Sequence, residues 1–240
     1  SIPYIDELLS GAVDLVAVPS HDITPKLLTH ADGLIIRSVT SINSSLLSKS
    51  SLQWIGSATS GIDHIADDVW RHPQIQVDAA PGSNARAVAE YVLCVLAALR
   101  VDGHLPDRAW RVGIIGCGHV GQLVQQFCES LGMLCVCVDP PREQHDHAFQ
   151  SASLDDCLDC DVITVHASLH REGPYPSECL LDARFLEACP PSTVLINTSR
   201  GEILDECALR PDRLTICLDV WQDEPAIHQS TVELSTLASP

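Results

Sequence analysis

The chain has 240 residues and a formal net charge of −18, and 45% of its residues are apolar and 19% charged. This charge argues against a broad surface for nucleic acid or anionic membrane, because such surfaces are rich in lysine and arginine. The length suffices for two domains, and no apolar run approaches the ~20 residues that span a bilayer. We therefore expect a soluble globular protein that binds anionic ligands through a few local arginines and backbone amides.

Eleven cysteines, an odd number, are scattered through apolar segments. Unpaired buried thiols are typical of a reducing compartment, so we expect a cytoplasmic protein. Cys157 and Cys160 have the spacing of a thioredoxin motif, and His145 and His147 could ligate a metal. Neither pair has the neighbours that such chemistry needs. We expect no redox centre and no metal site, and a solvated loop around the two histidines.

The first third of the chain predicts one α/β domain. Continuous apolar runs are separated by turn residues and helix-like stretches, at 13–19, 33–38, 53–59 and 74–80. Continuous rather than alternating apolar runs indicate strands covered on both faces, as in a parallel sheet flanked by helices. Pro81-Gly82 forms a natural boundary, so this domain is expected to span residues 1–82.

A long helix is predicted next, over residues 83–100, with apolar side chains on one side and Ser83 as N-cap. Six strand-like runs follow, at 111–116, 133–139, 161–167, 192–199, 214–221 and 235–239. Strands that alternate with helices favour a doubly wound parallel sheet. Residues 83–240 are therefore expected to form a second α/β domain.

The strongest local motif is the triplet Gly116-x-Gly118-x-x-Gly121, which follows a strand-like run and opens an amphipathic helix. In dinucleotide-binding folds these glycines form a tight turn, admit the pyrophosphate to the backbone and let helix and strand pack closely. Amides at the helix N-terminus then face the phosphates. Asp139 ends the next strand-like run. A carboxylate at this place accepts a hydrogen bond from the adenosine ribose and repels the 2′-phosphate of NADP, so the sequence favours NAD over NADP. A glycine turn without a dinucleotide is the alternative.

Two further polar motifs follow neighbouring strand-like runs. Arg200 comes directly after the run at 192–199. Asp219 lies near the end of the next run, at 214–221, and Glu224 follows that run. Ligands of parallel sheets bind at the carboxyl ends of the strands, and arginine can clamp a carboxylate with two parallel hydrogen bonds. An arginine paired with a surface acid and a solvated acidic loop are the simpler alternatives.

These segments resemble the D-isomer-specific 2-hydroxyacid dehydrogenases over nearly the whole chain. The stretches that carry the resemblance are "IRSVTSIN" (36–43), "IGSATSGIDH" (55–64), "AAPGSNARAVAEYVL" (79–93), "VDPPR" (138–142) and "EGPY" (172–175). The resemblance implies two doubly wound parallel-sheet domains, a flavodoxin-like substrate-binding domain (1–82) and a Rossmann NAD-binding domain (83–240), with the active site between them.

The double proline after Asp139 and the "GPY" stretch narrow the resemblance to the member of this family that oxidises 4-phospho-D-erythronate to 2-oxo-3-hydroxy-4-phosphobutanoate. This reaction lies on the route to pyridoxal phosphate. A dehydrogenase for another D-2-hydroxy acid, such as 3-phosphoglycerate, is one alternative. A non-catalytic NAD-binding sensor or interaction protein is another, because it keeps the glycine loop but needs no catalytic residues.

The resemblance also implies roles for individual residues. Arg200 would bind the substrate carboxylate and polarise the oxygen on the reacting carbon, and Glu224 would orient the acid/base histidine and raise its pKa. Ser38 and Thr59 match substrate contacts. The implied NAD contacts are Gly116, Gly118, His119, Val120, Gly121, Asp139, His166, Thr198, Ser199 and Asp219. We add Arg37 and Arg86 as candidates for the substrate phosphate, because this acidic chain offers few cations.

The ends of the sequence carry expectations of their own. In the family the acid/base histidine follows a short strand that ends in Ser-Pro or Thr-Pro, and this sequence stops at Ser239-Pro240. We expect the histidine directly after Pro240, little turnover by residues 1–240 alone, and a homodimer formed through segments outside them. A helical rather than strand-like start predicts a missing N-terminal segment. A short crossover after 192–199 predicts another between Leu209 and Arg210.

Overall fold

The fold is that of a computed structural model, which describes residues 2–238 except Pro3, Asp223, Pro225, His228 and Leu234. The expected end of the last strand at Ser239-Pro240 lies outside the described residues. The chain divides into two compact units, Ser1–Ser83 and Asn84–Pro240, and each is described by itself. Within the described part, no helix is both long and apolar enough to span a membrane.

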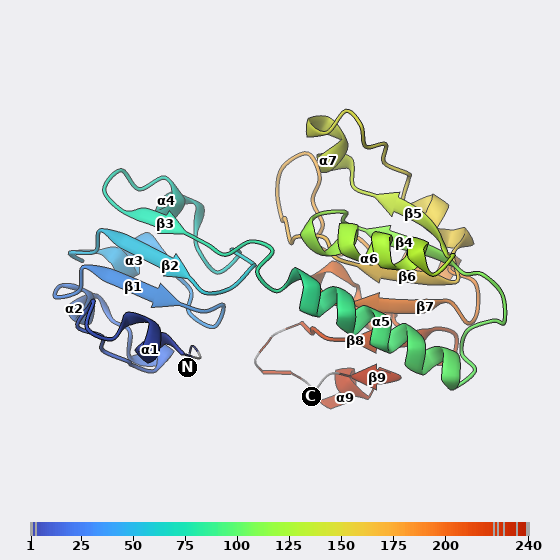
Figure 1. The fold of residues 1–240 in the computed structure, drawn as a ribbon, viewed down its shortest axis with the longest axis horizontal. Helices are drawn as coiled ribbons and strands as arrows, with labels where there is room; N and C mark the ends of the chain where they lie inside the picture. The colour runs from blue at the N-terminus through green and yellow to red at the C-terminus, as the bar shows by residue number, and fades with distance from the viewer. Residues whose placement is uncertain are drawn as a thin grey trace. The chain divides into compact units, whose positions relative to one another are not determined.

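The first unit is built on a three-stranded parallel sheet in the order β1-β2-β3 (Figure 1). Its strands are β1 (Gly33–Ile36), β2 (Trp54–Ser57) and β3 (Gln76–Asp78). Its helices are α1 (Ile5–Leu9), η1 (Ser20–Asp22), α2 (Pro25–Leu28), α3 (Ser44–Leu47) and α4 (Asp67–Trp70). All three strands fall within predicted runs, and one core joins strand residue Ile55 to helix residues Leu28 and Val69.

Residues 13–19, all of them described, do not form the strand predicted for them. They have no regular secondary structure, and Val13 and Val16 are 53% and 69% exposed. An apolar run becomes a strand only where another strand supplies partners for its backbone groups. In the described part of the first unit, β1 pairs with β2 alone. The prediction of a strand at 13–19 is therefore wrong, although its composition is strand-like.

The second unit contains a six-stranded parallel sheet in the order β5-β4-β6-β7-β8-β9. The strands are β4 (Arg111–Ile115), β5 (Leu134–Val138), β6 (Val162–Val165), β7 (Val194–Asn197), β8 (Thr215–Leu218) and β9 (Leu237–Ala238). Each lies within a predicted run, so the six-stranded parallel sheet is confirmed. Every residue of β6, β7 and β8 is buried, which is why these segments read as continuous apolar runs.

Helices cover the second sheet and divide its core in two. They are α5 (Ala85–Val101), α6 (His119–Ser130), α7 (Pro140–His145), η2 (Asp155–Asp159), α8 (Ala183–Ala188), η3 (Gly201–Ile203), η4 (Glu206–Ala208) and α9 (Gln229–Val232). Figure 1 shows α5 and α6 side by side across one face. Successive residues of β7 point to opposite faces, so Val194 packs with α5 and Leu195 with α8.

Two helix boundaries differ from the prediction. The long helix begins at Ala85, with Asn84 rather than Ser83 as its N-cap. The solvated loop around the two histidines is predicted at 142–150, but residues 142–145 belong to α7, because Asp139 caps the helix with its side chain and proline occupies the first helical positions. The loop therefore begins only after His145.

The connection from β7 to β8 is short and contains only η3 and η4 as regular elements. The Leu209 amide donates to the Glu206 carbonyl over 3.3 Å, and the Leu214 amide donates to the Arg210 carbonyl over 2.8 Å. Leu209 and Arg210 follow one another directly. The crossover closes without additional residues, so the structure gives no support to a missing segment at this point.

The order of the second sheet reverses at β4, which pairs with β5 on one side and with β6 on the other. Open α/β sheets bind ligands outside the carboxyl ends of their strands at such a reversal point. The carboxyl end of β4 carries the glycine motif. The fold therefore places the candidate site at this edge of the second unit.

Candidate active site

The first and third glycines of the motif are required by the packing of the protein itself. Gly116 has a φ of +88°, and a Cβ at this position would lie 2.4 Å from the backbone nitrogen of Ala167. A Cβ on Gly121 would lie 2.0 Å from the carbonyl oxygen of Gly116. These distances exclude any side chain. The loop between β4 and α6 is thus closed tightly against the start of its own helix.

The second glycine differs from the other two. Gly118 has a φ of −77°, and a Cβ there would meet no heavy atom within 4 Å. Neither backbone conformation nor packing requires glycine at this position. The open space lies at the N-terminus of α6, whose first turn contains His119 and Val120. A bare backbone before a helix N-terminus fits a phosphate group that must approach closely, so the loop fits the pyrophosphate of a dinucleotide.

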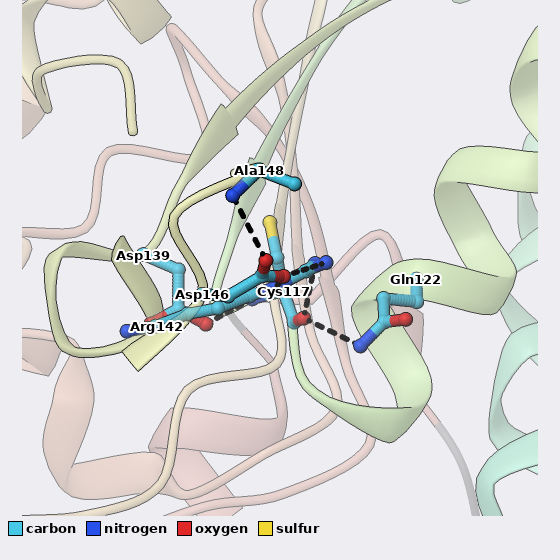
Figure 2. A network of polar contacts seen from close by, with 6 residues as sticks. All are labelled: Cys117, Gln122, Asp139, Arg142, Asp146 and Ala148. Carbon is cyan, nitrogen blue, oxygen red and sulfur yellow. Dashed lines mark hydrogen bonds and ion pairs between the residues drawn. The ribbon is translucent and has the colours of Figure 1, made fainter. Parts of the chain in front are cut away.

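Asp139 joins the glycine loop to α7 (Figure 2). Its Oδ2 accepts the amide of Cys117 over 2.7 Å, and its Oδ1 accepts the amide of Arg142 over 2.9 Å. Each carboxylate oxygen retains a second lone pair, so the side chain can still accept from a ribose hydroxyl. The two amides hold the carboxylate in one orientation beside the glycine loop, as the predicted ribose contact requires.

His166 and Thr198 follow β6 and β7 and contact each other. Nδ1 of His166 lies 2.9 Å from Oγ1 of Thr198, and Nε2 lies 3.0 Å from Oγ1 of Thr164. Burial lowers the pKa of His166 to about 3, so the ring is neutral at physiological pH. A neutral imidazole donates from one ring nitrogen and accepts at the other, so the ring can bridge the two hydroxyls. The residues thus lie as a pair at the edge where we predicted cofactor contacts.

The loop that carries Arg200 is held by Asn197, the last residue of β7. The fully buried Asn197 donates through Nδ2 to the Arg200 carbonyl over 2.8 Å. Its Oδ1 accepts the amide of Ser199 over 3.1 Å and the hydroxyl of Ser199 over 2.9 Å. Asn197 is not among the residues predicted from the sequence, although a polar residue inside an apolar run is a signal of a hydrogen-bonded brace. This brace fixes the backbone from which Arg200 projects.

Gly201 brings the Arg200 loop against the loop that follows β8. A Cβ on Gly201 would lie 2.0 Å from the carbonyl carbon of Trp221, so the two backbones touch. Beyond that contact, Oε1 of Glu224 accepts the Trp221 amide over 2.8 Å. The amide of Asp219 donates to the Asn197 carbonyl over 3.0 Å. The structure therefore brings Arg200, Asp219 and Glu224 to one edge of the second sheet.

Ser38 and Thr59 lie in the first unit, after β1 and β2 respectively. The Thr59 hydroxyl lies 2.9 Å from the hydroxyl of Ser57 and donates to the Gly61 carbonyl over 3.3 Å. Ser57 in turn lies 3.0 Å from Nε2 of the buried His64. Ser38 is exposed. Both candidates thus follow strands of the first sheet at its carboxyl edge, and hydroxyl contacts hold Thr59 there.

The two phosphate candidates have different surroundings. Arg86, on α5, donates through Nε to Glu90 over 2.8 Å in an exposed pair one helical turn apart. Arg37 directly follows β1, and its carbonyl accepts the amide of Thr40 over 3.0 Å. Arg37 therefore lies at the same sheet edge as Ser38, whereas Arg86 belongs to the second unit.

The candidate metal and redox residues lie in the core or in an exposed segment. Cys157 and Cys160 are buried free thiols in and beside η2 and belong to the core of the second unit. His145 ends α7 and His147 is exposed in the following loop. Among the residues that the structure describes, no group of three or more histidine, cysteine or acidic residues could hold a metal ion.

Comparison with known proteins gives a family match in the second unit. The model of the D-isomer specific 2-hydroxyacid dehydrogenase, NAD binding domain, matches residues 104–238. Among curated relatives, erythronate-4-phosphate dehydrogenase of Coxiella burnetii is 38% identical over 241 residues, covering 100% of this chain and 66% of its own length. The enzyme of that name from Teredinibacter turnerae is 37% identical over 247 residues, covering 100% and 65%. The chain thus spans just under two thirds of the length of these relatives.

Solved structures with the same fold include D-lactate dehydrogenase from Aquifex aeolicus complexed with NAD and lactic acid. It has a TM-score of 0.79 at 23% identity and covers 97% of this chain and 80% of its own. NAD+-bound 3-phosphoglycerate dehydrogenase from Entamoeba histolytica has a TM-score of 0.74 at 24% identity, covering 93% and 75%. At these identities the likeness concerns the fold alone, and it confirms the predicted parallel-sheet α/β class with a Rossmann domain.

Proposed function

The chain belongs to the D-isomer specific 2-hydroxyacid dehydrogenase family, and from this premise we propose that it serves in NAD-dependent oxidation of 4-phospho-D-erythronate to 2-oxo-3-hydroxy-4-phosphobutanoate. Curated relatives named erythronate-4-phosphate dehydrogenase support this substrate. One is 38% identical over 100% of the chain, and another is 39% identical over 95% of it. The double proline after Asp139 supports it from the sequence. The product would then feed the synthesis of pyridoxal phosphate.

The observation that carries nucleotide binding is Gly118. Its missing side chain is explained neither by conformation nor by packing, and the space before it opens onto the N-terminus of α6. In our proposal the amides of this turn bind the pyrophosphate, and Asp139 binds the adenosine ribose. NAD, when bound, supplies the acceptor for the hydride that leaves the substrate carbon.

The substrate residues come from both units in this proposal. Arg200 binds the carboxylate and polarises the oxygen at C2, and its loop is already braced by Asn197. Glu224, held against the backbone of Trp221, orients the acid/base histidine in this proposal. That histidine takes the hydroxyl proton during oxidation. Ser38, Thr59 and Arg37 are assigned to the substrate from the first unit, which makes residues 1–82 the substrate-binding domain and residues 83–240 the NAD-binding domain.

Two measurements test the proposal. Titration of residues 1–240 with NADH, followed by nucleotide fluorescence, should show saturable binding with little turnover. A longer protein that contains this chain and has the length of its curated relatives should reduce NAD faster with 4-phospho-D-erythronate than with 3-phospho-D-glycerate. A preference for 3-phospho-D-glycerate would assign the chain to another member of the family. Binding of NADH without turnover by the longer protein would favour the non-catalytic alternative.

We further propose a cytoplasmic homodimer whose partners are a small phosphorylated hydroxy acid and NAD, with no nucleic acid or membrane. All eleven cysteines are free, which supports a reducing compartment. The net charge of −18 disfavours nucleic acid and anionic membranes. The dimer rests on family resemblance, and sedimentation of the longer protein should give twice the mass of one chain.

A further inference from the structure

A cation lies beside the predicted ribose site. Arg142, in α7, donates through Nη1 to the carbonyl of Cys117 over 3.1 Å, while Asp139 accepts the amide of the same residue over 2.7 Å. A carboxylate and a guanidinium therefore hold the two polar groups of one residue in the glycine loop (Figure 2). In dinucleotide folds, an acidic residue at this place accepts the ribose 2′-hydroxyl, whereas a nearby arginine accommodates a 2′-phosphate. This site contains both kinds of group.

Asp146 holds the guanidinium. Its Oδ2 accepts from Nε of Arg142 over 3.1 Å and from Nη2 over 2.9 Å, while its Oδ1 accepts the amide of Ala148 over 3.1 Å. The ring of Phe149 covers the guanidinium, with its centroid 4.2 Å from the central carbon. All three nitrogens of Arg142 donate, and its charge is paired. The hydrogen bonds from Arg142 and Ala148 lower the pKa of Asp146, which keeps its carboxylate charged at neutral pH.

We propose that Asp146 is a specificity-determining residue for NAD against NADP, because it neutralises and anchors Arg142 and so withholds that cation from a 2′-phosphate. The inference rests on the proposed binding of NAD at this edge of the second unit. Asp139 repels the phosphate directly. Asp146 acts through Arg142. Removing the charge of Asp146 leaves the guanidinium beside the ribose site without its counterion, and removing the oxygen as well frees two donors.

The test measures dissociation constants of NADH and NADPH for the 240-residue chain by nucleotide fluorescence. The variants are Asp146→Asn, Asp146→Ser, Arg142→Gln and the double variant Asp146→Asn/Arg142→Gln. Serine at position 146 keeps an oxygen that can accept the Ala148 amide. The Asp146→Ser variant therefore removes the charge while the turn from residue 146 to Ala148 can still form. The matched control is Glu129→Gln, because Glu129 lines the same surface cleft as Arg142 and Asp146.

Both Asp146 variants should bind NADPH about tenfold more tightly relative to NADH, the size expected for one charge contact near a surface. This gain in relative affinity for NADPH should shrink as the salt concentration is raised, and it should disappear in the double variant. Glu129→Gln should leave the ratio unchanged.

A wild-type chain that binds neither nucleotide would overturn the proposed function and this inference together. If the wild type binds NADH but neither Asp146 variant gains affinity for NADPH, the inference alone is wrong. Loss of NADH binding by both variants would also overturn it, because Asp146 would then hold the site together rather than discriminate between nucleotides. An equal gain in Glu129→Gln would show a general charge effect and overturn it as well.

Discussion

The two parallel sheets of the chain differ in how completely they are covered. In the second unit every residue of β6, β7 and β8 is buried, and separate apolar cores cover the two faces. In the first unit β3 exposes two of its three residues, and one core serves the sheet. A sheet packed on both faces fixes the backbone at its edge, because close-packed side chains leave little room for displacement.

The loops at the two edges reflect this difference. At the second edge backbone meets backbone, as between Gly121 and Gly116 or between Gly201 and Trp221. At the first edge, side-chain hydroxyls make the contacts around Thr59. We infer that the second edge is preformed and tolerates no added atoms at these backbone contacts, whereas the first edge accepts small changes. Substitutions at the second edge should therefore cost more stability than substitutions at the first.

The largest effect is expected from Gly121→Ala. Its methyl group would lie 2.0 Å from the Gly116 carbonyl oxygen, so either the helix or the loop must move. The free energy of unfolding should fall by about 3 kcal/mol or more, at the upper end for overpacked cores. Urea unfolding followed by circular dichroism measures it. Gly132→Ala is not a suitable control because of its positive φ, whereas Gly118→Ala is, since its φ is ordinary. A stable Gly121→Ala variant would contradict a rigid second edge.

The second prediction concerns acid stability and His166. The pKa of this ring is about 3 in the folded chain and about 6.5 when unfolded, so between these values only the unfolded chain binds the proton. Stability should therefore fall as the pH drops below about 6.5, by about 1.4 kcal/mol for each pH unit between about pH 6 and pH 4. The loss attributable to this ring should end near pH 3.

Urea unfolding of the wild type and His166→Gln across this pH range isolates the contribution of His166, because other titrating groups are common to both. His147→Gln, at an exposed position, serves as the control and should keep the wild-type slope. Parallel pH profiles for wild type and His166→Gln would show that the ring is not buried between Thr164 and Thr198.

Gly118→Ala separates ligand binding from packing. An added Cβ meets no protein atom within 4 Å, so the free energy of unfolding should fall by only about 1 kcal/mol, the cost of replacing a preferred N-cap residue by alanine. The dissociation constant for NADH should rise at least about tenfold, or about 1.4 kcal/mol, because the methyl group occupies the space assigned to the pyrophosphate. Unchanged NADH affinity would remove the observation on which nucleotide binding rests.

The smallest effect is expected in the first unit, from Thr59→Val. The change keeps the shape of the side chain and removes two hydrogen-bond contacts, so stability should fall by about 1 kcal/mol or less. If Thr59 contacts substrate, kcat/KM of the longer, active protein should fall while NADH affinity stays unchanged. Ser45→Ala, on an exposed face of α3, provides a control in the same unit. A fall in stability as large as that of Gly121→Ala would erase the contrast between the two edges.

Structure was predictable from the sequence where a pattern is local. The strands of the second sheet were predictable because full burial demands continuous apolar residues, and the glycine motif because it lies between a strand and a helix. Prediction failed at residues 13–19, where an apolar run found no partner strand. Asn197 was not predicted either, since the groups that Asn197 braces are recognisable only once the turn after β7 is folded.

Apolar runs, the spacing of glycines and the carboxylate after β5 were enough to predict a dinucleotide site at the edge of a parallel sheet, because these features depend on neighbours in sequence. Folding alone shows that Gly116 and Gly121 serve packing whereas Gly118 leaves open space, since these distances join β4, β6 and α6. Folding also pairs Arg142 with Asp146 beside the glycine loop. The charge presented at this edge of the sheet depends on this pairing, which no count of charges reveals.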